Sequence, residues 1–258
     1  MTELLLQTQD ARGVVTLVLN DAARFNALGS DMLQALQEAL DKIAMDDSVR
    51  AVVLAAHGKA FCAGHNLKDM AAHPDLSYYQ ELFTQCSRMM LSIARLPVPV
   101  IARVHGMATA AGCQLVAQCD LAVASTEASF ATSGINYGLF CATPSVPLVR
   151  NVPFKQAMEM LLTGDFIDAH TAQAQGLVNR LVTPQNLDAS IEQMVSSIVQ
   201  KPATAVRMGK ALLYRQREMG LEAAYLLAGE SMACNMMDAD AQEGAQAFAQ
   251  KRQPQWRG

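Results

Sequence analysis

Pro97-Val-Pro-Val-Ile-Ala-Arg-Val-His-Gly106 is followed directly by Met107-Ala-Thr-Ala-Ala-Gly-Cys-Gln-Leu-Val-Ala-Gln-Cys119. Valine and isoleucine dominate residues 98–104, which predicts a buried strand. Gly106 ends that strand, and the alanine-rich residues after it predict a helix that runs to about Cys119. A strand that passes directly into a helix is typical of α/β folds, in which helices cover buried strands.

The same alternation extends to both sides of this stretch. Further strands are predicted at residues 14–19, 49–54, 121–124, 129–131 and 177–182, and helices from Ser30, over 79–94, over 155–163 and from Asp168 to Gly176. From Leu187 to the end, apolar stripes predict three or four more helices. We therefore expect an α/β core that carries a helical tail.

Composition excludes several classes of protein. Of the 258 residues, 51% are hydrophobic and 17% are charged, which excludes an intrinsically disordered chain. The net charge of −4 argues against nucleic acid as a partner. Every apolar stretch is interrupted before the roughly 18 residues that a membrane span needs. The first residues lack a signal peptide, and the six cysteines are expected to be free thiols in a cytoplasmic protein.

Common catalytic signatures are absent from the chain. It has no phosphate-binding loop, no dinucleotide-binding glycine pattern and no serine nucleophile elbow. The five histidines and six cysteines do not have the spacing of metal ligands, so no metal site is expected.

Two segments of small residues follow predicted strands and precede helices. They are Lys59-Ala-Phe-Cys-Ala-Gly-His-Asn-Leu-Lys68 and His105-Gly-Met-Ala-Thr-Ala-Ala-Gly-Cys-Gln114. Small side chains let a ligand approach the backbone, and free N–H groups at the start of a helix bind developing negative charge. Two such segments facing one carbonyl oxygen would form an oxyanion hole. The alternative is that the small residues serve only the close packing of helix on strand.

Several separated pieces of the chain together resemble the enoyl-CoA hydratase/isomerase family, the crotonase superfamily. Each piece is weak alone, but their order and separations are specific and extend over nearly the full length. They are Arg24-Phe-Asn-Ala-Leu28, Ala60 to Lys68, Pro97 to Gly106, Ala111-Gly-Cys-Gln-Leu115, Cys119-Asp120, Phe130, Ile135-Asn-Tyr-Gly138, and Glu243-Gly244 with Phe248 and Lys251-Arg252. The likeness is greatest to a subgroup described only as enoyl-CoA hydratase domain-containing.

The resemblance implies a crotonase (ClpP-like) spiral of β-β-α units. It implies a core with an acyl-CoA site over residues 1–195 and a C-terminal helical oligomerisation region over 196–258, building a homotrimer or hexamer. The ligand would be a coenzyme A thioester, with no tightly bound cofactor. The activity would be that of a lyase or isomerase of fatty acid metabolism.

The resemblance also implies roles for particular residues. The backbone N–H groups of His65 and Ala111 would form the oxyanion hole. Contacts to CoA would come from three places in the chain. These are Arg24, Phe25 and Ala27 near the N-terminus, Ala63, His65, Asn66, Leu67 and Lys68 in the first small-residue segment, and Phe248 and Lys251 in the tail, in some members from a neighbouring subunit. For Arg24 and Lys251, the alternative is a solvated surface charge.

The chain departs from the family at two positions. Hydratases of the family use two Glu as general acid and base, and this chain has Gln114 and Gly134 in their places. Neither residue can exchange a proton at neutral pH. Hydration by the two-Glu mechanism is therefore expected to be weak or absent.

Three side chains are candidates to substitute for the missing carboxylates: His65, Tyr137 and Cys141. Each has a structural alternative, namely a polar contact for His65, packing for Tyr137 and an inert buried thiol for Cys141. The leading hypothesis is a family enzyme that stabilises a thioester enolate or oxyanion without the two Glu. The alternatives are a true enoyl-CoA hydratase that uses substitute groups, and a non-catalytic acyl-CoA-binding or regulatory protein.

Overall fold

The computed structural model describes residues 3–257 and contains two β-sheets. The larger has the order β1-β2-β3-β5-β7-β10, from Leu5–Gln9, Val14–Leu19, Ala51–Ala56, Val100–Val104, Leu121–Ser125 and Arg180–Val182. The smaller has the order β4-β6-β8-β9, from Ala60–Cys62, Met107–Thr109, Ser129–Ala131 and Ile167–Asp168. Only the pairs β1–β2 and β8–β9 are antiparallel.

From β3 to β8, successive strands alternate between the two sheets, which makes the fold a spiral. Strands β3, β5 and β7 belong to the larger sheet, and each is followed within a few residues by a strand of the smaller sheet, β4, β6 or β8. Helices then lead to the next pair, as α4 (Ala111–Gln118) does after β5 and β6. This is the expected arrangement of β-β-α units. Because β4, β6 and β8 are parallel, the turns that follow them lie at the same end of the smaller sheet.

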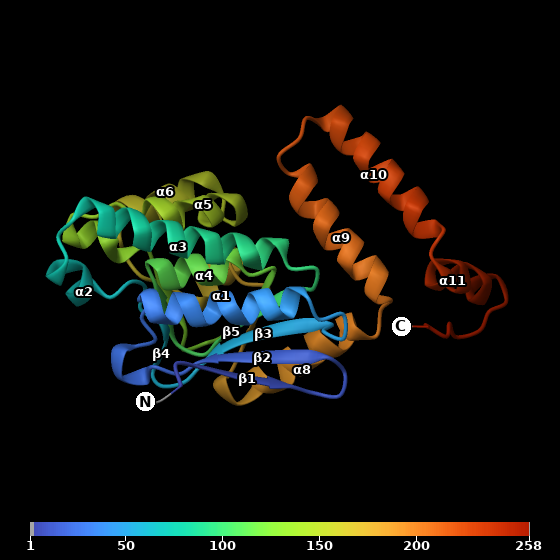
Figure 1. Cartoon of the computed structure of the whole chain (residues 1–258), viewed down its shortest axis with the longest axis horizontal. Coiled ribbons are helices and arrows are strands. Elements are labelled where there is room, and N and C mark those ends of the chain that lie inside the picture. Colours follow the sequence, from blue (N-terminus) through green and yellow to red (C-terminus); the bar gives the residue numbers. More distant parts are fainter. Residues whose placement is uncertain (1–2, 258) are drawn as a thin grey trace.

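Helices cover both faces of the larger sheet (Figure 1). On one face, α1 (Ser30–Ala44) and α3 (Leu76–Arg95) bury apolar residues at helical spacing, among them Leu33, Leu36 and Leu40. On the other face, α8 (Leu187–Val199) packs Ile191 and Val195 against Val53 and Ile101. Short α2 (Leu67–Ala72), α5 (Ala142–Asn151), α6 (Phe154–Thr163) and α7 (Ala169–Ala174) complete the core.

The last three helices extend away from this core as an arm (Figure 1). They are α9 (Ala203–Gln216), α10 (Leu221–Met236) and α11 (Ala239–Ala249). After α11 the chain returns to the base of the arm, where the Trp256 indole N–H donates to the Gln200 carbonyl oxygen at 2.9 Å. The arm carries many exposed apolar residues, which are Leu213, Leu221, Tyr225, Leu226, Met232, Met236, Met237 and Phe248.

A buried ion pair holds the arm to the core. The Lys210 ammonium of α9 donates to Asp120 Oδ2 at 2.7 Å and to the carbonyl oxygens of Ile93 and Val98, both at 2.9 Å. Asp120 also accepts from the Tyr214 hydroxyl at 2.9 Å and from the Val100 N–H at 2.7 Å. Burial lowers the pKa of Lys210, and the neighbouring Asp120 opposes that shift. All three protons of the ammonium therefore have an acceptor.

The α/β class, the strand at 14–19 and the helical tail agree with the sequence predictions. Asp168 caps α7 through the Thr171 N–H, and Gly164 ends α6 with φ of 68°, both as expected. Several boundaries differ from prediction, since α3 spans 76–95 rather than 79–94, β5 begins at Val100 rather than at 98, and β10 begins at Arg180 rather than at 177. Gly29 is the N-cap of α1 in place of Ser30, and β3 begins at Ala51 rather than at 49. Within residues 3–257, no helix is long and apolar enough to cross a membrane.

Candidate active site

The first small-residue segment forms a tight turn between β4 and α2. Gly64 has φ of 86°, a conformation that favours glycine. Two backbone hydrogen bonds tie the turn to residues 25–28, one from the Ala63 N–H to the Phe25 oxygen at 3.0 Å and one from the Leu28 N–H to the Gly64 oxygen at 2.8 Å. Asn66 caps α2. The turn therefore has a fixed position next to the N-terminal loop.

The second segment makes an equally sharp turn between β6 and α4. Ala110 has φ of 50° and ψ of −120°, which is unusual for a residue with a side chain. Its N–H donates to the Ala131 oxygen and its carbonyl accepts from the Gln114 N–H, both at 3.0 Å. Backbone strain of this kind costs about 1–3 kcal/mol and persists where the surrounding structure enforces it.

The two turns are in contact with each other. A Cβ placed on Gly64 would lie 2.9 Å from the Ala110 Cβ and 3.0 Å from the Ala111 nitrogen. Within residues 3–257, the N–H groups of His65 and Ala111 donate to no hydrogen-bond acceptor. Unpaired backbone donors are rare inside proteins. Two of them on adjacent turns provide donors for one oxygen atom of a ligand.

A cavity of about 600 Å³ opens beside these turns. Its walls are mainly apolar and include Met70, Phe83, Leu139, Phe140 and Phe166. Because most of these residues come from α2, α3 and the segment after β8, the spiral assembles the cavity from distant parts of the chain.

Most of the predicted site residues line this cavity. They are Arg24, Ala27, Ala63, His65, Asn66, Leu67, Ala111 and Gly134. Phe25 and Lys68 are exposed outside it, and Gln114 is buried away from its lining. Phe248 and Lys251 lie on the arm at the end of α11 and do not line the cavity of their own chain. The structure thus brings together the two turns and the N-terminal loop but leaves the tail residues apart.

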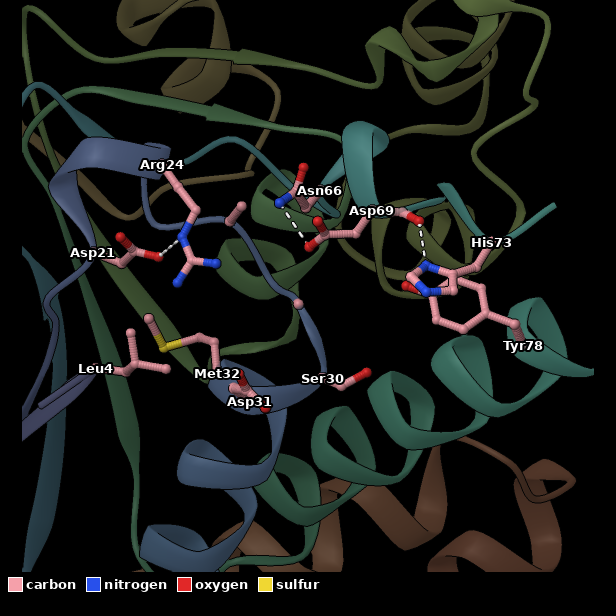
Figure 2. Close-up of a pocket in the computed structure, with 12 residues that line it drawn as sticks. Leu4, Asp21, Arg24, Ser30, Asp31, Met32, Asn66, Asp69, His73 and Tyr78 are labelled. Atoms are coloured by element: carbon pink, nitrogen blue, oxygen red, sulfur yellow. Dashed lines mark hydrogen bonds and ion pairs between the residues drawn. The ribbon is translucent and has the colours of Figure 1, made fainter. Parts of the chain in front are cut away.

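Arg24 and Asn66 also border a neighbouring pocket of about 180 Å³. Figure 2 shows Arg24 turned toward Asp21 and Asn66 turned toward Asp69. The Arg24 Nε is 2.6 Å from Asp21 Oδ2, and the Asn66 amide donates to Asp69 Oδ2 at 2.7 Å. The other two guanidinium nitrogens of Arg24 make no hydrogen bond within the described residues. They are available to an anionic group at the mouth of the cavity.

His65 has an unused acceptor nitrogen. Its Nδ1 lies 2.8 Å from the Leu28 carbonyl oxygen, which can only accept, so Nδ1 carries the proton. Its Nε2 is buried and has no partner within residues 3–257. Burial lowers the pKa of His65, while the bond to Leu28 acts in the opposite direction. The imidazole is therefore held in its neutral form, with an unpaired acceptor lone pair on Nε2.

The positions of the two missing carboxylates differ in the space they offer. Gln114 is 4% exposed, and its Oε1 has no partner in the described part of the chain. Gly134 has no room for a side chain, since a Cβ there would lie 2.6 Å from the Leu139 oxygen and 2.8 Å from Cys141 Sγ. A carboxylate at 134 would therefore require Leu139 and Cys141 to move.

The other two candidate substitutes are less suited to proton transfer. Tyr137 lines the cavity but is 74% exposed. Cys141 is buried, and burial raises the pKa of its thiol, although an N–H group from Gly134 opposes the shift. A thiol in this environment stays protonated at neutral pH.

Sequence reasoning did not single out two hydroxyl groups in the cavity. Thr109 Oγ1 and Ser133 Oγ lie 2.7 Å apart, and both residues line the cavity wall. Each stands next to a predicted position, Thr109 two residues before Ala111 and Ser133 one residue before Gly134. Their nearness to these positions in the sequence could have indicated that both hydroxyl groups lie in the cavity. Among residues 3–257 there is no cluster of three His, Cys, Asp or Glu that could hold a metal ion.

Comparison with known proteins places this geometry in a family. Residues 9–258 match the enoyl-CoA hydratase/isomerase family. A crystal structure of an enoyl-CoA hydratase from Mycobacterium smegmatis is 62% identical, has a TM-score of 0.98 and covers all of both chains. The structure of human enoyl Coenzyme A hydratase domain-containing protein 3 is 41% identical with a TM-score of 0.95, covering 98% of this chain and 100% of that one.

A curated relative gives the same result and corrects one expectation. Enoyl-CoA hydratase domain-containing protein 3, mitochondrial, from Xenopus laevis is 45% identical over 248 residues, which are 96% of this chain and 84% of the relative. The proteins of that name from Rattus norvegicus and Homo sapiens are also mitochondrial. These names point to the mitochondrion, so the expectation of a cytoplasmic location was wrong. The composition of a chain does not encode the compartment to which it is delivered.

The expected resemblance, including that to the domain-containing subgroup, is confirmed by these matches. The spiral of β-β-α units is the crotonase fold of the solved relatives. Members of the family are enzymes that act on CoA thioesters. This chain belongs to the enoyl-CoA hydratase/isomerase family.

Proposed function

We propose that this protein binds an acyl-CoA thioester and stabilises its enolate or oxyanion with the backbone N–H groups of His65 and Ala111. The observation that supports this most is the contact between the two turns, which leaves two unpaired donors at the edge of an apolar cavity. Such donors stabilise a negatively charged oxygen more than a neutral carbonyl. His65 Nε2 is the group available to accept a proton in place of the absent carboxylates.

The binding of CoA follows from the same arrangement. The mouth of the cavity is bordered by Arg24, Ala27 and Asn66, with the exposed Lys68 nearby in sequence. Cationic side chains at a cavity entrance suit the phosphates of CoA, and the apolar walls suit an acyl chain.

The arm supplies the proposed assembly. We infer that residues 196–258 form an oligomerisation region on the core of residues 1–195, giving a homotrimer or hexamer. The exposed apolar residues of α10, such as Tyr225, Leu226 and Met232, support this, since large exposed apolar patches mark interfaces. In such an assembly, Phe248 and Lys251 would approach the CoA site of a neighbouring subunit.

Infrared spectroscopy of a bound thioester tests the proposed oxyanion hole. With butyryl-CoA carrying ¹³C in its carbonyl, we expect the carbonyl stretch to move to lower frequency on binding, because two N–H donors polarise the bond. The matched control is S-butyl-CoA, a thioether without the carbonyl oxygen, which should bind about tenfold more weakly. A failure to bind any acyl-CoA, or an unchanged stretch in the complex, contradicts the proposal.

Hydration of crotonyl-CoA is expected to be slow. Each missing acid–base group typically removes about 10²–10⁴-fold in rate. Gln114→Glu alone should not restore rapid hydration, because the second position, Gly134, is closed by Leu139 and Cys141. The rate of hydration by the wild type and by Gln114→Glu is measured from the loss of absorbance of the conjugated thioester. Rapid turnover by the wild type, unchanged in Gln114→Glu, would favour a hydratase that uses substitute groups.

A further inference from the structure

Thr109 and Ser133 both line the cavity, and their hydroxyl groups are hydrogen-bonded to each other. Within residues 3–257, this is the one hydrogen bond between the side chains of two residues that line the cavity. Thr109 is the last residue of β6, and Ser133 begins the short 3₁₀ turn Ser133–Tyr137 after β8. Their oxygens are 2.7 Å apart, and Thr109 is only 7% exposed. The hydrogen bond therefore joins a buried hydroxyl to a partly exposed one in the cavity wall.

A count of protons shows what the pair leaves unused. Two hydroxyls carry two protons, and their mutual hydrogen bond uses one of them. Within residues 3–257, neither hydroxyl makes another hydrogen bond. The second proton therefore lacks an acceptor on the described part of the protein. An oxygen atom of a ligand can provide that acceptor.

The surroundings select the kind of oxygen. The nearby lining is apolar or uncharged, with Met107, Ala110, Leu139 and Cys141. Arg24 is the only charged residue of the described chain that lines the cavity, and it is paired with Asp21 at the mouth. An anionic carboxylate buried beside the hydroxyls would have no counter-charge, which is costly. A neutral hydroxyl or keto oxygen has no such requirement.

The place of the pair along the chain indicates which part of the ligand it meets. One residue separates Thr109 from Ala111, whose N–H is proposed to bind the thioester oxygen. The pair therefore faces the first carbons of the acyl group rather than its far end. Resting on the proposed function, we propose that Thr109 and Ser133 are specificity-determining residues that bind a neutral oxygen at C3 of the acyl group.

The proposed role of Thr109 and Ser133 is tested by comparing the affinities of two ligands that differ by one oxygen atom. Isothermal titration with butyryl-CoA and 3-hydroxybutyryl-CoA, with both enantiomers measured, should show that the wild type prefers one hydroxylated enantiomer by about tenfold. Thr109→Val keeps the shape of the side chain and should abolish the preference, which is measured as the ratio of the affinities for the two ligands in the same variant. Thr109→Ser retains the hydroxyl and should retain the preference.

Each outcome separates this inference from the proposed function. Equal affinities for butyryl-CoA and both hydroxylated ligands in the wild type, or an unchanged preference in Thr109→Val, overturn the role of the pair. Failure of all three ligands to bind overturns the acyl-CoA function itself. Ser133→Ala, a change in a partly exposed residue, provides the same test if Thr109→Val does not fold.

Discussion

Replacing Lys210 with methionine is expected to lower the free energy of unfolding by about 3–5 kcal/mol. The side chain of Lys210 is 6% exposed and that of Asp120 is 14% exposed, so the remaining carboxylate would be buried without its counter-charge. The carbonyl oxygens of Ile93 and Val98 would lose a donor as well. Urea denaturation at pH 7 measures the effect. Light scattering would show whether the mass of the protein in solution changes when the arm loses this anchor.

An exposed ion pair provides the control for Lys210. Asp47 pairs with Arg207 of α9 at 2.9 Å and is 99% exposed, and exposed pairs of this kind contribute about 0–1 kcal/mol. Asp47→Asn should therefore change stability little. If Lys210→Met and Asp47→Asn have equal effects, the buried pair does not anchor the arm.

Replacing Gly64 with alanine is expected to reduce kcat/KM by about 10²–10³-fold for any acyl-CoA that the wild type turns over. The added Cβ would meet Ala110, the Ala111 nitrogen and the Thr109 oxygen within 3.0 Å. The two turns would have to separate, which would disrupt the proposed oxyanion hole. Steady-state kinetics and the carbonyl stretch of bound butyryl-CoA measure the loss.

Gly138 offers a matched control for this substitution. It has φ of 80°, close to the 86° of Gly64, but a Cβ there would meet no atom within 4 Å. Both alanine variants carry the backbone cost of a left-handed residue, about 1–2 kcal/mol. Only Gly64→Ala also moves the turns. Equal kinetics in the two variants would show that the spacing of the turns does not matter for the chemistry.

The sequence predicted the local parts of the site better than the parts assembled over long distances. Glycine and alanine at two transitions from strand to helix indicate sharp turns with free N–H groups, and the structure contains both turns. The tautomer of His65 depends on the Leu28 carbonyl, 37 residues away, which periodicity cannot predict. The opposing wall depends on Phe83 and Phe166, which meet only when the spiral closes.

Secondary structure, too, was predicted better where the signal is local than where it depends on distant parts of the chain. Strand 14–19 was predicted with its boundaries, because an unbroken run of apolar and β-branched residues is a local signal. Helix α5 was not predicted, since Pro144 and Pro147 weaken the helical signal of its sequence. Short strands β4 and β6 have three residues each, and only their parallel pairing with a distant strand defines them. The proposed contact of Phe248 and Lys251 with CoA requires a neighbouring subunit, which the pattern of a single chain cannot predict.

The crowding around Gly134 makes conversion of this protein into a two-carboxylate enzyme a multistep problem. Any side chain introduced there first collides with a backbone oxygen and a sulfur atom, so the single variant is less stable than its parent before it gains activity. Selection for hydratase activity would have to reshape residues 139–141 beforehand, and libraries that begin at Gln114 and Gly134 alone would stall.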